Sequence, residues 1–253
     1  MLSLLRRRLR ARVSTSRWPA VPAPTVGRQQ PVFDPARCDL NGACASACPV
    51  AAISVDGSFS LDRARCISCS RCIEVCPTGA LAPGIGFATP ALGRESLLEP
   101  PVHPPAAVRE LAERARAVLG RSLHVRHVDA GSCNGCDWEI SATTNAVHDI
   151  QRFGIDFVAS PRHADVLLVT GTMTRNLQIA VRRTYDAMSE PRLVVAVGAC
   201  ACSGSPFEPG YASGEGAAAE LPVDVYIPGC PPRPEAIIQG LLLAVGRIGE
   251  ARI

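Results

Sequence analysis

The feature that most constrains this chain is a set of three cysteines that occurs twice with the same spacing. The two copies are Cys38, Cys44 and Cys48, and then Cys66, Cys72 and Cys76, with a proline after the last cysteine of each. Two copies of one short unit predict a small pseudo-symmetric domain over residues 31–82. A unit this short buries little apolar surface, so we expect bound metal to stabilise it.

The chain has 12 cysteines in 253 residues. A secreted protein would use them in disulfides, but no apolar signal region follows the N-terminal arginines, and residues 11–24 are polar and broken by prolines. No apolar run approaches the roughly 18 residues that a membrane span needs. We therefore expect a cytoplasmic protein whose cysteines are metal ligands.

The second copy of the repeat is complete. Besides Cys66, Cys72 and Cys76 it contains Cys69, and these four cysteines have the spacing of a bacterial ferredoxin. In a ferredoxin, the first three bind one cubane and the fourth, before proline, binds the cluster of the other half. The predicted ligands of one [4Fe-4S] cluster are therefore Cys48, Cys66, Cys69 and Cys72. A zinc site is the alternative, but zinc sites pair two cysteines from each of two loops.

The first copy lacks one ligand, because Asn41 stands where the repeat requires the counterpart of Cys69. The thiolates left for the second cluster are Cys38, Cys44 and Cys76. A neutral amide is a poor ligand for iron compared with a thiolate. We expect a [3Fe-4S] cluster, or an atypical [4Fe-4S] cluster with Asp39, water or Asn41 on the fourth iron; loss of the site is the remaining alternative.

The pattern of the chain changes towards residue 121. Apolar runs predict buried strands at 123–128, 166–169, 193–197 and 223–227, and helices are expected at about 141–152, 176–189 and 234–247. Alternating strands and helices predict an α/β domain with a mainly parallel sheet, here residues 106–253. Residues 83–105 carry six prolines and predict an extended linker, and residues 106–119 are expected to form a helix.

Four cysteines of this second domain follow expected strands. Cys200 comes after the run that ends near Val197, and Cys230 after the run that ends near Ile227. Ligands gather at the carboxyl ends of strands in open parallel sheets. We therefore expect Cys133, Cys136, Cys200 and Cys230 to bind a third cluster, a [4Fe-4S] cubane, and Cys202 to remain uncoordinated.

Four motifs of this domain carry a family resemblance. They are Gly131-Ser-Cys-Asn-Gly-Cys-Asp-Trp-Glu139, residues 160–165 (SPRHAD), residues 197–204 (VGACACSG) and residues 223–234 (VDVYIPGCPPRP). Together they resemble the B-type subunit of respiratory complex I and its hydrogenase relatives. The N-terminal part is similar to the ferredoxin subunit of formate hydrogenlyase, so the chain resembles a fusion of two adjacent subunits. Complex I has two adjacent cysteines where this chain has Cys133 and Cys136, and the spaced form is similar to energy-converting [NiFe] hydrogenases.

The resemblance implies an electron-transfer subunit of a membrane-associated oxidoreductase, with no catalytic centre of its own. It implies a hydrogenase large subunit-like partner, or a complex I D-type protein, together with membrane-integral subunits. The expected location is the cytoplasmic face of the inner membrane. Glu139, which the family also has, is a possible proton relay. A complex I–like relay to quinone and a non-redox zinc scaffold are the alternative functions.

Residues 1–30 form a basic segment before the first domain. Seven arginines precede the first acidic residue, Asp34, and without them 19 basic residues face 23 acidic ones. The body of the protein is therefore mildly acidic, which argues against nucleic-acid binding. Residues 1–13 have apolar side chains at helical spacing, so residues 1–17 are expected to contact a membrane surface or another subunit.

Overall fold

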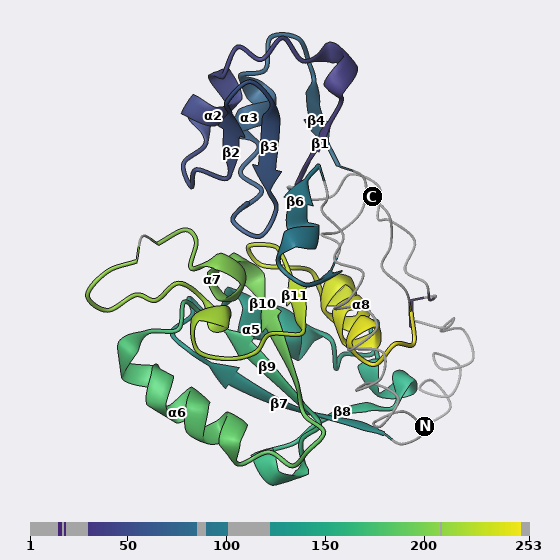
Figure 1. Ribbon diagram of the computed structural model, residues 1–253. Coiled ribbons are helices and arrows are strands. Elements are labelled where there is room, and N and C mark those ends of the chain that lie inside the picture. The colour runs from purple at the N-terminus through teal and green to yellow at the C-terminus, as the bar shows by residue number, and fades with distance from the viewer. Residues whose placement is uncertain are drawn as a thin grey trace, which may run out of the picture.

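The computed structural model describes residues 15–16, 18, 30–84, 90–100, 122–207 and 209–248. A small domain, drawn in purple and blue, sits on a larger α/β domain (Figure 1). The helices expected within residues 1–13 and 106–119 lie outside the described residues. None of the helices in the described part is long and apolar enough to cross a membrane.

The small domain consists of short elements around an apolar core. Its elements are β1 (Pro31–Phe33), η1 (Pro35–Arg37), α2 (Ala43–Ala47), β2 (Ile53–Val55), β3 (Phe59–Asp62), α3 (Arg71–Glu74) and β4 (Leu81–Pro83). Strands β1 and β4 pair antiparallel, as do β2 and β3. The core includes Phe59, Leu61 and Leu81 together with the cysteines Cys66 and Cys72. The sulfur atoms therefore line the centre of the domain.

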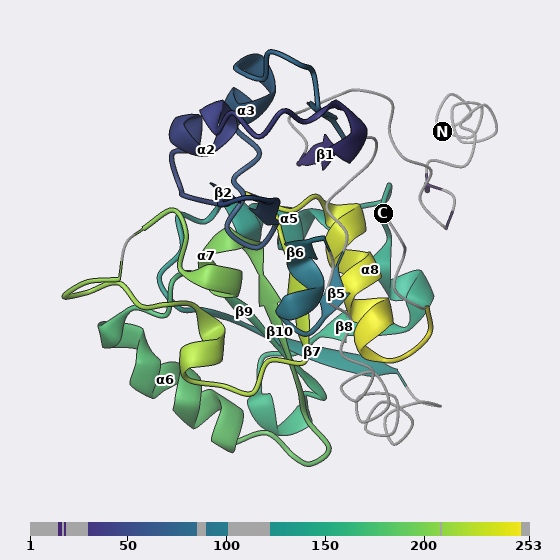
Figure 2. The same ribbon diagram turned by 45° about the horizontal axis from the view of Figure 1, so that its top comes forward.

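The second domain has the predicted α/β fold. Its elements are β7 (Leu123–Asp129), α5 (Gly135–Ala142), η3 (Ile150–Phe153), β8 (Ile155–Phe157), η4 (Pro161–His163), β9 (Val166–Thr170), α6 (Arg175–Asp186), β10 (Leu193–Val197), α7 (Gly198–Ser203), η5 (Ala217–Ala219), β11 (Val225–Ile227) and α8 (Pro234–Ala244). The sheet order is β5-β11-β10-β9-β7-β8, and all pairings are parallel except that of β5 (Ala91–Leu92). Figure 2 shows α7 between the sheet and the small domain.

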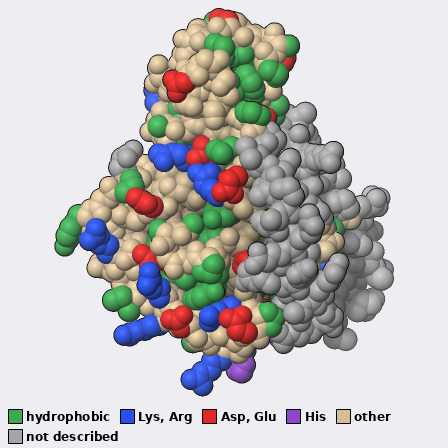
Figure 3. Space-filling model, in the orientation of Figure 1, with side chains coloured by type: hydrophobic (Ala, Val, Ile, Leu, Met, Phe, Trp, Pro, Cys, Tyr) green, Lys and Arg blue, Asp and Glu red, His purple; other side chains and the backbone are tan. Residues whose placement is uncertain are grey.

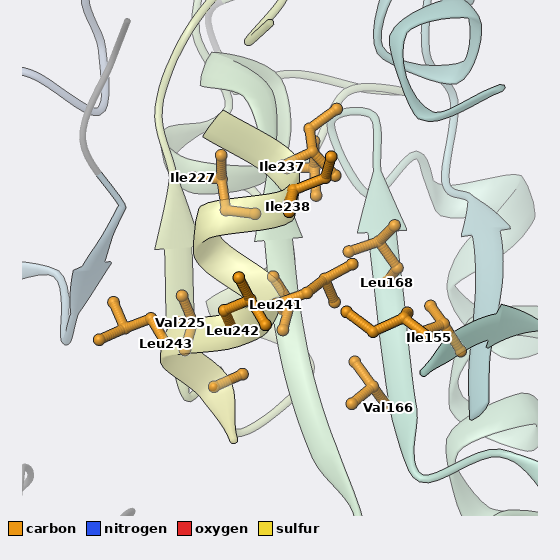
Figure 4. Packing of buried hydrophobic residues seen from close by; sticks show 14 of the residues in the cluster. Ile155, Val166, Leu168, Val225, Ile227, Ile237, Ile238, Leu241, Leu242 and Leu243 are labelled. Carbon is orange, nitrogen blue, oxygen red and sulfur yellow. The ribbon is translucent and has the colours of Figure 1, made fainter. Parts of the chain in front are cut away.

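Helix α8 closes one face of this sheet. Its side chains Ile237, Ile238 and Leu241 are at most 1% exposed, and they pack with Leu168 and Ile227 of the strands (Figure 4). Pro234 lies in the first turn of α8, as predicted, where its missing N–H has no intrahelical partner to lose. This packing fixes the strand ends from which the cysteine loops emerge.

The helix expected at about 141–152 is wrong. The structure has α5 at Gly135–Ala142 and the short helix η3 at Ile150–Phe153, with turns between them. Thr143 donates its hydroxyl to the carbonyl of Ile140, and Asn145 Oδ1 accepts the backbone amides of Val147 and His148. These side chains offer the backbone an alternative to helical hydrogen bonds, so the helix ends.

Residues 90–100, within the proline-rich segment, tie the two domains together. Strand β5 joins the edge of the large sheet beside β11. After η2 (Glu95–Leu97), strand β6 (Leu98–Glu99) pairs with β3 of the small domain. One segment thus extends a sheet in each domain. The domain boundaries given by the sequence remain a prediction.

Three described residues of the N-terminal segment pack on the second domain. The Trp18 ring meets the Phe153 ring edge-on, with 5.3 Å between centroids. The Ser16 amide donates to the carbonyl of Val147, and Arg152 donates to the carbonyl of Ser16. The segment is therefore anchored near η3.

Candidate iron–sulfur centres

The cysteines of the complete motif surround one hollow in the small domain. Cys48, Cys66, Cys69 and Cys72 line it together with apolar side chains that include Val50, Ile53 and Leu61. The backbone amides of Ala52 and Ser68 point at the sulfurs of Cys48 and Cys66, at 3.2 and 3.4 Å. Four sulfurs around an apolar hollow, with amide donors behind them, fit an iron–sulfur cluster, whose potential such hydrogen bonds tune.

Burial keeps these thiols protonated when no metal is bound. Burial, with smaller contributions from the neighbouring cysteines, raises the pKa of Cys66 to about 11 and that of Cys72 to about 12. A thiol must lose its proton to bind a metal, so loading this site releases protons. A buried thiolate lacks stabilisation by water, so bound iron would have to stabilise its negative charge.

The cysteines of the incomplete motif surround a second hollow. Cys38, Cys44 and Cys76 line it together with Asp39 and Asn41. The three cysteines still face one hollow, so the loss of one cysteine has not closed the site. Burial raises the pKa of Cys44, and Cys38 and Cys76 raise it further, which indicates that the three sulfurs lie together.

The backbone around the incomplete motif repeats that of the complete one. Left-handed φ values occur at Leu40 (56°) and Ser68 (55°), which occupy equivalent positions of the two copies, and again at Gly42 (76°) and Ser70 (68°). A side chain in this region costs roughly 1–2 kcal/mol. Leu40 therefore keeps the strained loop conformation of its counterpart Ser68.

Asn41 uses both ends of its side chain within the protein. Its Oδ1 accepts the backbone amide of Ala43 at 2.9 Å, and its Nδ2 lies 2.6 Å from Oδ1 of Asp39. The oxygen thus closes a turn of the Asx type over residues 41–43, just before α2. In this arrangement both ends of the Asn41 amide make hydrogen bonds within the loop.

Cys76 differs from the buried thiols. Burial slightly opposes its ionisation, but the Thr78 hydroxyl and the amides of Leu81, Ala80 and Thr78 outweigh it, so its pKa is lowered. The Thr78 oxygen lies 3.6 Å from the sulfur. The sulfur of Cys76 therefore ionises more readily than that of Cys44.

The third group of cysteines lies at the carboxyl ends of the parallel strands. Cys136 and Cys200 are buried, whereas Cys133 and Cys230 are exposed. Burial, together with the neighbouring Cys230 and Cys133, raises the pKa of Cys200 to about 11. Burial also raises the pKa of Cys136, with contributions from Cys200 and Cys230. The four predicted residues are thus brought together, with one side open to the surface.

Gly198 makes room for this group. It has φ +86°, and a Cβ atom there would stand 2.5 Å from the sulfur of Cys136. Only glycine fits this cradle, so the chain leaves space around the sulfurs. Cys202 faces away from it: its sulfur lies 3.6 and 3.5 Å from the carbonyls of Ala196 and Ile227, within the core.

The pairing of strands gives the order of the sites in the small domain. The incomplete hollow touches Phe33 and Val55, whereas the complete one touches Pro31 and Leu61. Leu61 pairs with Glu99 of β6, on the side of the second domain. The complete group therefore lies nearer the second domain and the incomplete group at the far end.

A polar network that the sequence did not suggest holds the Cys133–Cys136 loop. Asp137 Oδ1 lies 2.9 Å from both His127 Nε2 and the Thr170 hydroxyl, and its Oδ2 accepts the Ser132 hydroxyl at 2.7 Å. His127 and Thr170 belong to neighbouring strands, so the loop is tied to the sheet on both sides. Asp137 directly follows Cys136, which was the only sequence signal for it.

Glu139 lies half-buried on α5. Burial raises its pKa, Glu235 raises it further, and Arg233 and His148 lower it. Arg233 Nε lies 3.6 Å from Oε2 of Glu235. A carboxyl with a raised pKa beside the third cysteine group suits a proton relay, a role that remains a prediction. Among the described residues, no three His, Cys, Asp or Glu side chains are grouped to hold a single metal ion.

Comparison with known proteins identifies the two parts. Residues 133–244 match the family described as NADH ubiquinone oxidoreductase, 20 Kd subunit, and residues 37–80 match the 4Fe-4S dicluster domain. The probable membrane-bound hydrogenase subunit mbhJ of Pyrococcus furiosus is 46% identical over 132 residues, 52% of this chain and 79% of that protein. The chain belongs to this oxidoreductase subunit family. The resemblance that the motifs predicted is confirmed, including the N-terminal ferredoxin-like domain.

Other members of the oxidoreductase subunit family have different names. Formate hydrogenlyase subunit 7 of Escherichia coli is 46% identical over 132 residues, 52% of this chain and 52% of that protein, so the chain spans about half the length of that relative. The B-type NADH-quinone oxidoreductase subunit of Geotalea uraniireducens is 49% identical over 117 residues, 46% of this chain and 68% of that protein. Identity alone does not separate the hydrogenase members from the quinone oxidoreductase members.

Proposed function

We propose that this protein is an electron-transfer subunit of a membrane-associated [NiFe]-hydrogenase-like complex. It binds two clusters in the small domain and a third in the second domain. The bound clusters supply one-electron chemistry, and the chain holds them in sequence. The observation that carries this proposal is the order of the three cysteine groups. They run from the far end of the small domain to the carboxyl ends of the parallel strands in the second domain.

The residues proposed to bind the clusters follow the three groups. Cys48, Cys66, Cys69 and Cys72 bind one [4Fe-4S] cluster, and Cys133, Cys136, Cys200 and Cys230 bind another. Cys38, Cys44 and Cys76 bind the third, which is a [3Fe-4S] or atypical [4Fe-4S] cluster because Asn41 is tied to Asp39 and Ala43. The preserved hollow and loop geometry support occupation of this site over its loss.

The open side of the third group supports a partner protein there. Cys133 and Cys230 are exposed, and the neighbouring Trp138 is 76% exposed. A large apolar side chain beside a cofactor site is typical of an interface. We assign this face to a hydrogenase large subunit-like protein, with membrane-integral subunits completing the complex on the cytoplasmic face of the inner membrane. The spaced Cys133–Cys136 pair, which resembles the hydrogenase members, favours this partner.

Metal analysis and redox spectroscopy of the full chain test the proposal. Anaerobically purified protein is expected to hold about 11 or 12 irons, from two four-iron clusters and a third of three or four irons. A redox titration followed by electron paramagnetic resonance should show three one-electron centres, with a three-iron cluster visible when oxidised and the cubanes visible when reduced. Zinc in place of iron would contradict the proposal and support a structural scaffold.

The alternative is a complex I–like relay to quinone, supported by the similarity to the B-type subunit of NADH-quinone oxidoreductase. The identity of the partner protein distinguishes the hydrogenase-like complex from the complex I–like relay. A co-purifying large subunit that contains nickel supports the hydrogenase-like complex. A nickel-free D-type partner whose complex reduces quinone supports the alternative.

A further inference from the structure

The two domains meet at a dry junction beside two cysteine groups. Arg63 is 5% exposed, and Ala64 is fully buried within a core cluster that also contains Ala201 and Cys202 of α7. Cys66 follows two residues after Ala64, so the loop that enters the second domain leads directly into the complete cysteine motif. Charged side chains of both signs lie along this boundary (Figure 3).

Two serine hydroxyls cross the junction. Ser205 Oγ, on a residue that is 1% exposed, donates to the carbonyl of Arg65 at 2.9 Å. Ser203 Oγ lies 3.1 Å from the carbonyl of Ala64 and 3.0 Å from that of Ala199, so its single proton is directed to either. The acceptors Ala64 and Arg65 are the two residues that precede Cys66.

The serines are themselves held in place. Gly204, with φ +77°, turns the chain between them, and its amide donates to the carbonyl of Cys200 at 2.8 Å. A Cβ at Gly204 would stand 2.8 Å from the carbonyl of Gly214, so the turn is closely packed. Ser203 lies one helical turn after Cys200 on α7. The serines therefore connect the Cys66 loop to the segment that carries Cys200.

We propose that Ser203 and Ser205 are positioning residues that fix the separation of the Cys66 and Cys200 cluster sites, and so set the rate of electron transfer between the two domains. This inference rests on the proposed electron relay. In that relay the Cys66 loop would hold the cluster that gives up one electron, and α7 would hold the cluster that accepts it, with no change of bonds or protons. Electron transfer slows steeply with distance, so a loosened junction slows this step.

Loss of the two hydroxyls should loosen the junction because the carbonyls that accept their hydrogen bonds are buried. Water has little access to the junction, so removing both hydroxyls leaves the carbonyls of Ala64 and Arg65 without these donors. Buried carbonyls that lose their donors favour opening of the contact to admit water. Residues 90–100 still hold the domains together, so the expected change is a looser contact and not separation.

The test compares the full chain, loaded with clusters, with the double variant Ser203→Ala/Ser205→Ala. After one-electron photoreduction, transfer between the clusters should be slower in the double variant. The spin–spin splitting between the reduced clusters should also weaken, while iron content and the individual potentials stay unchanged. Thr184→Ala is the matched control, because it removes a hydroxyl that donates only to Ala180 within α6.

Each outcome decides one claim. A double variant with the transfer rate and splitting of the parent overturns the role of the serines. A parent that shows neither transfer nor splitting overturns the relay itself. If the double variant loses iron, the single variant Ser205→Ala replaces it, and parent-like splitting there would also overturn the inference.

Discussion

The amide nitrogen of Asn41 lies 2.6 Å from the carboxylate of Asp39, and this pair occupies the position where the repeat requires a cysteine. The Asp39 carboxylate also accepts the backbone amide of Asn41 at 3.3 Å. The side chains of Asp39 and Asn41 thus close the loop of the first copy by hydrogen bonds, at the position where the second copy has Cys69. The loop keeps its shape without a fourth thiolate.

Asn41→Cys should convert the atypical cluster into an ordinary cubane. It completes the thiolate set, and the added negative charge lowers the reduction potential of this cluster. Electron paramagnetic resonance of the oxidised protein measures the change. An oxidised three-iron cluster is paramagnetic, whereas an oxidised ferredoxin cubane is silent, so the signal should disappear.

The control is Asn41→Ala. It removes the hydrogen bonds to Asp39 and Ala43 without adding a thiol, so it should lower the free energy of unfolding by about 1 kcal/mol and leave the spectrum unchanged. A spectrum altered by Asn41→Ala would mean that the amide does bind iron. Three ordinary cubanes in the parent would mean that Asn41 does not mark a missing ligand.

Cys200→Ser and Cys230→Ser should each remove or weaken the third cluster and leave the signals of the small domain. Both residues follow strands, so the loss of one ligand does not disturb the core. Cys202→Ser is the matched control, because a hydroxyl can make the same hydrogen bonds to Ala196 and Ile227. If Cys202→Ser lost the third cluster and Cys200→Ser kept it, Cys202 and not Cys200 would be the ligand on α7.

The sequence predicted the strands of the second domain well because their apolar runs are fully buried. Val166–Thr170 and Leu193–Val197 are buried at every position, so hydrophobicity alone marks them. The spacing of the cysteines and the strand ends also predicted which sulfurs lie close together, whereas their assignment as cluster ligands remains a prediction. Local sequence patterns therefore predict buried strands and the spacing of cysteine groups.

Contacts between distant segments were not predictable from such patterns. Strand β5 has two residues and is a strand only because β11 offers it a free edge. The hydrogen bonds of Asn41 depend on the turn between Asp39 and Ala43. The hydroxyl of Ser205 depends on a carbonyl 140 residues away. Tertiary structure supplies these interactions, and no local propensity indicates them.

Glu139→Gln should slow hydrogen turnover by the assembled complex without changing its cluster content. The amide keeps the size of the side chain but cannot carry a proton between the cluster side and the partner. Turnover measured over a series of pH values checks this. Unaltered rates at every pH would leave Glu139 with a structural role only.

The same variant has a predicted effect on stability. Burial raises the pKa of Glu139 in the folded protein, so its favourable contribution is present below the unfolded pKa and is lost as pH rises through the folded pKa. Glu139→Gln should therefore be at least as stable as the parent at neutral pH, and this advantage should vanish in acid. Thermal unfolding from pH 4 to pH 8 measures the difference, and the opposite trend would contradict the assigned direction.

Arg63→Met should destabilise the junction between the domains. Arg63 Nη2 binds Glu99 at 2.7 Å and Nη1 binds the carbonyl of Pro31, and its side chain is only 6% exposed. The expected loss is about 2–3 kcal/mol, below the roughly 3–5 kcal/mol of fully buried pairs because Glu99 is partly exposed.

Arg182→Met is the control for Arg63→Met. Arg182 pairs with Glu220, but its side chain is 59% exposed. The loss of a surface pair should cost about 0–1 kcal/mol. Denaturant unfolding of cluster-loaded protein compares the two, and equal losses would show that burial of Arg63 adds nothing.

Deletion of residues 2–17 should leave cluster binding intact and weaken membrane attachment. It removes the apolar stripe and six arginines, each worth about 1 kcal/mol near an anionic surface, and this attraction is screened by salt. Trp18 remains against Phe153, so part of the anchor on the second domain is kept. Recovery in the membrane fraction, at low and high salt and in cells without the other subunits, measures the attachment. Because a single short amphipathic segment binds reversibly, the parent should already be released by high salt. Equal recovery of parent and deletion at both salt concentrations would mean that residues 1–17 do not contact lipid.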